Sequence, residues 1–358
     1  MSKASASKEV DNKTKLSQTR IWSRFEKKIP ATRTPKPKLS WVVDAVLPIT
    51  LSLLAAIIVL LPTSLPTQGR LSLFAFAIAI ILWSTTSLNA AYVALAAVIL
   101  LILSGGSDQE KLFEALESDV IWLMIGAFIL GGAVQQTGLA ARLTQVVVSQ
   151  AHTVGKVFWL MTTILIPLAF VIPSTSGRAA VVIPVFRSIV NATGDRKITR
   201  ALALLMPTVI LVSTISTLIA ASSHLIAIDL LDEIADVNLS YTQWVVYGFP
   251  FGVIASYLSC WVVMHLFLNK NLRQRPLEIT KQKQKSFSRA EKTTLIVVLA
   301  MVILWLTESW HGLEIATVTV IGALVLTAPG IGAIDWKDGL KAVSWNLIIF
   351  VGAALVLG

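Results

Sequence analysis

This sequence has few of the residues that build disulfide frameworks, metal centres and solvated surfaces. It contains one cysteine, Cys260, and four histidines, and 14% of its 358 residues are charged. A single cysteine excludes a disulfide within the chain, and the histidines show no metal-binding spacing. HExxH, GxSxG and phosphate-binding glycine loops are absent. An intramembrane enzyme is therefore disfavoured, because the apolar segments hold no paired acids or metal triad.

Apolar residues dominate the sequence instead. They make up 55% of the chain, and the mean hydropathy is +0.75. Such a composition is typical of a polytopic membrane protein, which we expect to be all-α. The apolar segments cover residues 41–61, 71–86, 88–103, 120–137, 157–190, 201–231, 244–268, 293–310, 313–327 and 345–358.

Positive charge lies beside the membrane segments. The net charge is +10, with eleven Lys or Arg among residues 1–40 and eight more in residues 269–292. Basic flanks mark the cytoplasmic side of a membrane protein, so this distribution does not indicate nucleic-acid binding. We expect a cytoplasmic N-terminal tail and a multi-pass protein of the cell (inner) membrane. The remaining loops alternate in charge as this orientation requires.

Residues 157–190 contain two apolar arms that meet at a polar break. The arms supply 16 and 12 apolar residues, whereas a spanning helix needs about 20. The break, PSTSGR, covers residues 173–178. Irregular backbone at membrane depth must line protein or a water-filled cavity. The segment therefore predicts a re-entrant helical hairpin with a polar tip, which points to a transporter.

The expected tip has the chemistry of an anion site. Ser174 or Thr175 could cap the second arm, so that free N–H groups face a cavity beside Ser176. Gly177 allows close backbone approach, and Arg178 could pair with a carboxylate or sulfate. The alternatives are simple helix capping for the hydroxyls and a structural ion pair for the arginine.

A second polar cluster, STISTLIAASSH, covers residues 213–224 inside the long apolar run 201–231. As one helix these 31 residues would measure about 46 Å, against a membrane core of about 30 Å. We expect a break in this helix, where freed carbonyls and Thr214 or Thr217 could hold a small cation. The alternative is that the hydroxyls only join helices. His224 is a candidate proton site or a packing residue.

Two parts of the chain resemble each other. Residues 71–132 and 295–358 align at an offset of 222 to 226, with Trp83 matching Trp305. The loop charges place the two copies in opposite orientations, which predicts an inverted repeat, the architecture of many secondary carriers. The second copy reaches Gly358 inside a helix, so we expect about 130 further residues in a complete repeat.

The expected organisation follows from these features. It consists of a basic cytoplasmic tail (1–40), scaffold helices of the first repeat (41–156), a hairpin, broken helix and following helix (157–268), a basic cytoplasmic loop (269–292), and the first three helices of the second repeat (293–358).

The order of these parts resembles the divalent-anion:sodium symporter family, the dicarboxylate, citrate and sulfate carriers. The resemblance covers about residues 41–358. The family's Ser-Asn-Thr hairpin tip falls on Ser174, Thr175 and Ser176, and STISTLIAASSH is similar to its stretch ending Gly-Thr-Pro-Asn. The segment YTQWVVYGFP, residues 241–250, also resembles the opening of the family's next helix.

The resemblance implies a homodimeric elevator carrier of a small anion, a dicarboxylate, citrate or sulfate, with sodium as the expected coupling ion and no organic cofactor. The implied anion ligands are Ser174, Thr175, Ser176 and Arg178, and the implied cation ligands are Ser174, Thr175, Thr214, Thr217 and Ser223. Thr175 replaces the family's asparagine and Ser223-His224 its Pro-Asn, so proton coupling stays open. The alternative is a proton-coupled antiporter or exporter of the same broad superfamily.

Overall fold

The computed structural model describes residues 40–61, 65–237, 239–277 and 286–357. These residues are mainly helical, and no β-strand forms among them. The basic tail lies outside them. Five helices are long and apolar enough to cross a membrane, and a pair bent by 56° could make a sixth span. The five are α3 (Thr67–Thr85), α6 (Asp119–Gln136), α8 (Val154–Val171), α10 with its extension (Arg196–Ser216) and α12 (Tyr241–Phe267). The expected all-α polytopic membrane protein is confirmed.

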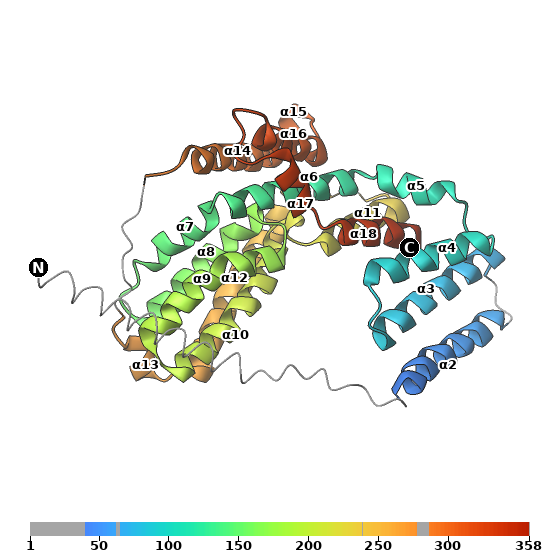
Figure 1. The fold of residues 1–358 in the computed structure, drawn as a ribbon, viewed down its shortest axis with the longest axis horizontal. Coiled ribbons are helices and arrows are strands. Elements are labelled where there is room, and N and C mark those ends of the chain that lie inside the picture. The colour runs from blue at the N-terminus through green and yellow to red at the C-terminus, as the bar shows by residue number, and fades with distance from the viewer. Residues whose placement is uncertain (1–39, 62–64, 238, 278–285, 358) are drawn as a thin grey trace, which may run out of the picture.

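The first helices form a group at one end of the molecule (Figure 1). In this group α2 (Ser40–Leu60) packs on α3, and α3 packs on α4 (Ala90–Leu103). The last helix, α18 (Trp345–Leu357), also lies against α4. Small side chains, among them Ala79 and Ala94, lie at this interface and allow the helices to approach closely.

A second group of helices combines α5 to α7 with α14 to α18, which are distant in the sequence. The short α5 (Glu110–Glu117) leads into α6, and Gly138, with a φ of 76°, turns the chain into α7 (Leu139–Val148). Helix α6 packs along α16 (Ile315–Thr327), which α14 (Arg289–Leu306) and α15 (Glu308–His311) precede. Helix α17 (Trp336–Ala342) also contacts α6 and, with α18, is the bent pair.

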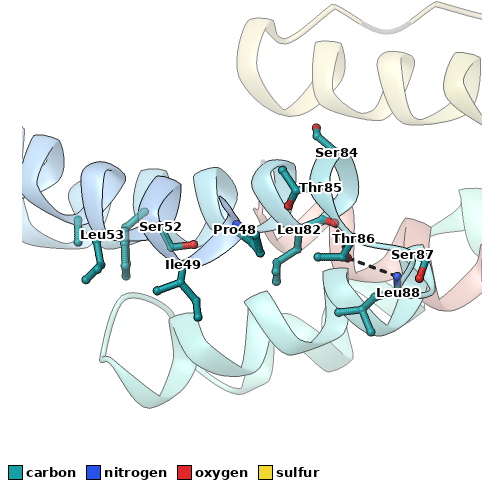
Figure 2. A pocket seen from close by; sticks show the side chains of 12 residues that line it. Pro48, Ile49, Ser52, Leu53, Leu82, Ser84, Thr85, Thr86, Ser87 and Leu88 are labelled. Atoms are coloured by element: carbon teal, nitrogen blue, oxygen red, sulfur yellow. Dashed lines mark hydrogen bonds between the residues drawn. The ribbon is translucent and has the colours of Figure 1, made fainter. Parts of the chain in front are cut away.

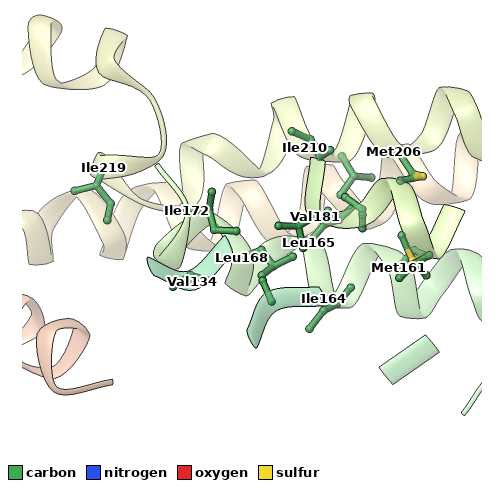
Figure 3. Close-up of a cluster of buried hydrophobic side chains, with 14 of the residues drawn as sticks. Val134, Met161, Ile164, Leu165, Leu168, Ile172, Val181, Met206, Ile210 and Ile219 are labelled. Carbon is green, nitrogen blue, oxygen red and sulfur yellow. The ribbon is translucent and has the colours of Figure 1, made fainter. Parts of the chain in front are cut away.

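The predicted hairpin is a pair of helices, α8 and α9 (Thr175–Thr193), joined at residues 172–174. It packs with α10 (Arg196–Val212) and α12 in a hydrophobic core, part of which Figure 3 shows. The first arm differs from the expectation. Thr153 caps α8 three residues earlier than the apolar run suggested, so α8 has 18 residues and could itself cross a membrane.

The predicted break in the second polar cluster is also present. After α10 the chain forms one 3₁₀ turn over Ser213–Ser216 and another over Leu218–Ala220, and then enters α11 (Ser222–Ala235). Thr217 and Ala221 have extended backbones with φ near −150°. The described part of the basic loop forms α13 (Lys270–Gln274) after α12.

An ion pair between the half-buried Arg142 and the buried Glu291 joins α7 to the start of α14. Nε of Arg142 lies 2.8 Å from Oε1 of Glu291, and the guanidinium lies 4.6 Å from the ring centroid of Phe287. Oε2 of Glu291 accepts the backbone N–H of Ser288 at 2.7 Å. That N–H, together with the Ser288 hydroxyl and Arg142, holds the pKa of the Glu291 carboxyl below its usual value.

We expect Glu291→Gln to lower the free energy of unfolding by about 2 kcal/mol near pH 7, because a hydrogen-bonded charge pair is lost. A depressed carboxyl pKa stabilises the fold above the unfolded-state pKa, and the effect disappears as pH falls through the lower folded-state pKa. Thermal unfolding from pH 8 to pH 3 measures this. Wild type and variant should converge at the acid end, and a pH-independent difference contradicts the assignment.

Candidate functional site

The hairpin tip is organised by capping of α9. Ser174 is the N-cap residue, and its hydroxyl accepts the N–H of Gly177 at 3.1 Å. The N–H of Arg178 bonds to the carbonyl of Ser174 at 2.9 Å. The first N–H groups of a helix have no intrahelical acceptor, so those of Thr175 and Ser176 remain available to an anion. Capping of α9 by Ser174 is therefore compatible with an anion site at the same helix end.

A cavity of about 340 Å³ opens beside this tip. Three parts of the chain contribute to its wall: the end of α6, the tip itself, and the break between α17 and α18. The lining residues are Phe128, Gly131, Gly132, Gln135, Ile172, Pro173, Ser174, Ser176, Gly177, Ala180, Ala342 and Ser344. A Cβ at Gly177 would lie 2.6 Å from Nε2 of Gln135, so only glycine lets this amide approach the helix end.

Arg178 faces the other side of the tip. Its side chain is fully buried, and Nη1 donates to Oγ of Ser213 at 3.1 Å. Among the described residues, Nε and Nη2 of Arg178 have no hydrogen-bond partner. The predicted anion ligands are thus divided: Ser174 and Ser176 line the cavity, whereas Arg178 points from the same helical turn toward the broken helix.

The broken helix turns only some of its hydroxyls inward. Ser216 is fully buried, and its Oγ lacks a partner among the described residues. Of the predicted cation ligands, Thr214 donates to the carbonyl of Leu211 at 2.6 Å, and Thr217 is bonded to the hydroxyl of Tyr241 at 2.9 Å. Ser223 is exposed. In this structure Thr214 and Thr217 are thus hydrogen-bonded within the protein, whereas Ser223 is exposed.

The sequence analysis did not place Gln135, Ser344 or Tyr241 in the site. Gln135 and Ser344 are brought to the tip by helices distant in the sequence. Within the described ranges, no three His, Cys, Asp or Glu side chains come close enough to hold a metal ion. Hydroxyl and carbonyl oxygens are thus the candidate cation ligands near the tip.

A larger cavity, about 830 Å³, lies between α2 and α3 and does not serve the same purpose (Figure 2). Its wall combines apolar side chains, such as Leu53 and Phe74, with hydroxyls at the end of α3. The hydroxyls of Ser84, Thr85 and Thr86 donate to carbonyls one turn earlier in their own helix. None of the residues that line it is charged, so it offers little to an anion.

Comparison with known proteins bears on what this arrangement does. A family model described as the sodium:sulfate symporter transmembrane region matches residues 42–358. A protein of Cupriavidus necator named only as a membrane protein is 26% identical over 90% of this chain and 67% of its own length. A putative malate transporter of Bacillus subtilis is 25% identical over 74% of this chain and 58% of its own.

A citrate/succinate antiporter of Escherichia coli is 22% identical over 67% of this chain and 52% of its own length. The chain thus spans about half to two thirds of the curated relatives it matches. The family and its functionally named members are transporters, not enzymes. With a match over nearly all of its length outside the basic tail, this chain belongs to the sodium:sulfate symporter family, the divalent-anion:sodium symporters.

Proposed function

We propose that this protein is a secondary active carrier of small di- and tricarboxylate anions, placed in the inner membrane with its basic tail in the cytoplasm. Arg178 carries the proposal, because a buried guanidinium without an ionic partner among the described residues favours the binding of an anion close to the hairpin tip. The named relatives support carboxylates: one is a putative malate transporter, and others are citrate/succinate and L-tartrate/succinate antiporters. Sulfate is supported by the family description alone.

The proposed anion site is the start of α9. A substrate carboxylate would accept from the N–H groups of Thr175 and Ser176 and from the hydroxyl of Ser176, while the Ser174 cap fixes the turn. Arg178 lies in the same first turn, so its charge adds to the positive end of the helix dipole. Gln135 of α6, whose amide lies against Gly177, would also donate to the substrate.

Two modes of coupling follow from the same tip. In the first, sodium binds between the tip and the broken helix, with ligands from Ser174, Thr175, Thr214, Thr217 or Ser223 and nearby carbonyls. In the second, Arg178 supplies a fixed positive charge in that space and the carrier exchanges one anion for another. The guanidinium and the antiporters among the relatives favour exchange. Among the described residues, no acidic side chain forms an ion pair with this arginine.

We also propose that the fold contains an inverted repeat. Helices α4 and α6 would correspond to α16 and α18 of the second copy. In the structure α6 packs on α16, and α4 packs on α18. The short helices follow the same pattern, because α17 contacts α6 and α5 contacts α18. Two copies related by a two-fold axis make such reciprocal contacts. If α4 of the first copy packs on α18 of the second, then the helices equivalent to them, α16 and α6, must pack on each other.

Transport in this proposal is an elevator movement within a homodimer. The hairpin, the broken helix and α12 (within 157–268) pack on one another and would move as one body. The helices of residues 41–156 and 293–358 would form the scaffold, which the basic loop 269–292 joins to the moving part. The proposed substrate cavity lies at the contact of the two, between the tip and the ends of α6 and α17.

Counterflow in proteoliposomes tests this function. Vesicles containing the purified full chain are loaded with unlabelled succinate and diluted into labelled succinate, in sodium or in choline buffer. We expect labelled succinate to enter loaded vesicles in both buffers, and malate, citrate or tartrate inside to support entry as well. Protein-free vesicles and vesicles loaded with chloride are the controls.

The outcomes separate the alternatives. Counterflow that needs sodium would replace exchange with sodium coupling and keep the carboxylate carrier. Counterflow with sulfate and none with carboxylates would reverse the substrate assignment. Failure of every anion in folded, vesicle-inserted protein would reject the proposed function.

A further inference from the structure

The segment between α10 and α11 keeps its irregular shape although much of it is buried. Two 3₁₀ turns alternate with the extended residues Thr217 and Ala221, and Leu218–Ala220 are almost completely inaccessible. A short 3₁₀ turn is a weak structure by itself, and α-helix is the usual conformation of apolar backbone at this depth. Contacts with other parts of the protein must therefore maintain the irregular conformation of this segment.

The first two turns of α12 provide that support through two aromatic hydrogen bonds. The hydroxyl of Tyr241, which is 1% exposed, lies 2.9 Å from Oγ1 of Thr217. Nε1 of Trp244 donates to the carbonyl of Ile215 at 3.1 Å. These two bonds bind the side chain of Thr217 and the carbonyl of Ile215. In a continuous α-helix both groups would point in other directions.

Two glycines let the segment lie directly on α12. A Cβ at Gly248 would overlap the carbonyl oxygen of Ile215, and a Cβ at Gly252 would overlap Oγ of Ser216. Gly248 and Gly252 are one turn apart, so they form a shallow groove along the helix. The groove and the two aromatic residues face the same short stretch, residues 215–217.

Ring contacts fix the aromatic residues themselves. The Trp244 ring lies 4.8 Å from the ring of His224, which is in the first turn of α11, beyond the irregular segment. The Tyr241 ring lies 5.6 Å from that of Trp305, a fully buried residue of α14. Trp305 in turn donates to Oγ1 of Thr319 at 3.1 Å. The support therefore extends from the irregular segment into α14 and α16.

We propose that Tyr241 and Trp244 are positioning residues, which hold residues 215–217 in their irregular form and so keep the Ser213 hydroxyl beside Arg178. Ser213 lies two residues before the carbonyl that Trp244 binds, and it is the hydrogen-bond partner of the guanidinium. Neither aromatic residue needs to touch the substrate. The effect on transport rests on the proposed function, whereas the effect on the segment does not.

Hydrogen exchange measures the effect on the segment without substrate. Tyr241→Phe removes one hydrogen bond and keeps the ring, whereas Trp244→Phe removes one hydrogen bond and replaces the indole by a smaller aromatic ring. We expect amide exchange of residues 215–221 to rise about fivefold to tenfold in both variants. Tyr257→Phe is the matched control, because that hydroxyl makes a similar bond, at 2.8 Å to Thr163, elsewhere on α12. Trp261→Phe is the second control.

Succinate counterflow measures the effect on the site. We expect KM to rise about fivefold to tenfold in both variants while the maximal rate per folded carrier changes less than twofold. Thr217→Val should raise KM similarly, and the double variant with Tyr241→Phe should add nothing further, since both changes remove the same bond.

Two results would overturn the proposal: exchange of residues 215–221 as in the Tyr257 control, or a loss of folded carrier with KM unchanged. If wild-type protein carries no anion at all, the proposed function fails, and hydrogen exchange alone then decides the role of Tyr241 and Trp244.

Discussion

Arg178→Gln abolishes succinate counterflow, with an expected loss of at least a hundredfold. The substitution keeps a side chain that can donate to Ser213 but removes the positive charge at the hairpin tip. A charge-assisted contact in a buried site is worth about twice a neutral one, and the anion would otherwise enter a site without countercharge. Initial counterflow rates, normalised to the amount of inserted carrier, measure the effect.

The fold should tolerate this change. A buried charge without an ionic partner destabilises a protein, so removing it is expected to leave the unfolding temperature unchanged or to raise it. Arg178→Lys keeps the charge but lacks the planar set of donors, and we expect intermediate activity. Arg187→Gln is the matched control on the exposed part of the same helix. Normal counterflow by Arg178→Gln would show that the guanidinium is structural.

The glutamine variant also distinguishes the two modes of coupling. If Arg178 takes the place of a coupling cation, its loss leaves the tip short of one positive charge, and added sodium could restore part of the activity. If sodium is already bound in the wild type, the variant should not gain a new sodium dependence. Counterflow of Arg178→Gln in sodium and in choline buffer makes this comparison.

The sequence was sufficient to predict the two irregular features of the fold, because each contradicts an ordinary spanning helix locally. Pro173 followed by hydroxyls interrupts an apolar run, and the structure has a helix boundary there. The run 201–231 is too long for one span, and the chain unwinds at its hydroxyl cluster. Length and composition carry this information, and they require no knowledge of distant contacts.

The arrangement of the site could not be predicted in the same way. The direction of Arg178 toward Ser213, away from the cavity beside Ser176, depends on how α9 rotates against α10. The hydroxyl of Thr217 is occupied because Tyr241, 24 residues later, lies opposite it. Apolar periodicity places hydroxyls on a helix, but it does not determine which neighbouring helix meets them.

The first arm of the hairpin shows a smaller limit of sequence reasoning. Its apolar run starts at Val157, but the helix begins earlier. Thr153 is the N-cap residue, and Lys156 belongs to the first turn of α8, before the apolar run. Hydropathy marks where a helix enters an apolar environment, whereas capping marks where the helix begins. The difference matters here because α8 then reaches the length of a membrane span.

Gly248→Ala is expected to lower the free energy of unfolding by about 1 to 3 kcal/mol and to reduce counterflow at least tenfold. Replacing glycine by alanine in a helix normally stabilises the helix by about 1 kcal/mol. A decrease in the free energy of unfolding at Gly248 would therefore point to the steric contact. The added methyl group would overlap the carbonyl oxygen of Ile215, a backbone atom that cannot rotate away. Helix α12 must then separate from the irregular segment, and the Trp244 hydrogen bond is lost. Thermal unfolding and counterflow of the purified variant measure both effects.

Two further glycines calibrate this result. Gly252→Ala meets the Ser216 hydroxyl, a side chain that can change rotamer, so we expect a smaller loss than at Gly248. Gly69→Ala on α3 places its methyl group 3.8 Å from Pro66, an ordinary contact, and should be neutral or stabilising. The expected order of stability is Gly69→Ala, Gly252→Ala, Gly248→Ala. If Gly248→Ala instead matched Gly69→Ala, α12 would not lie against the irregular segment as described, and the support for residues 215–217 would have to come from elsewhere.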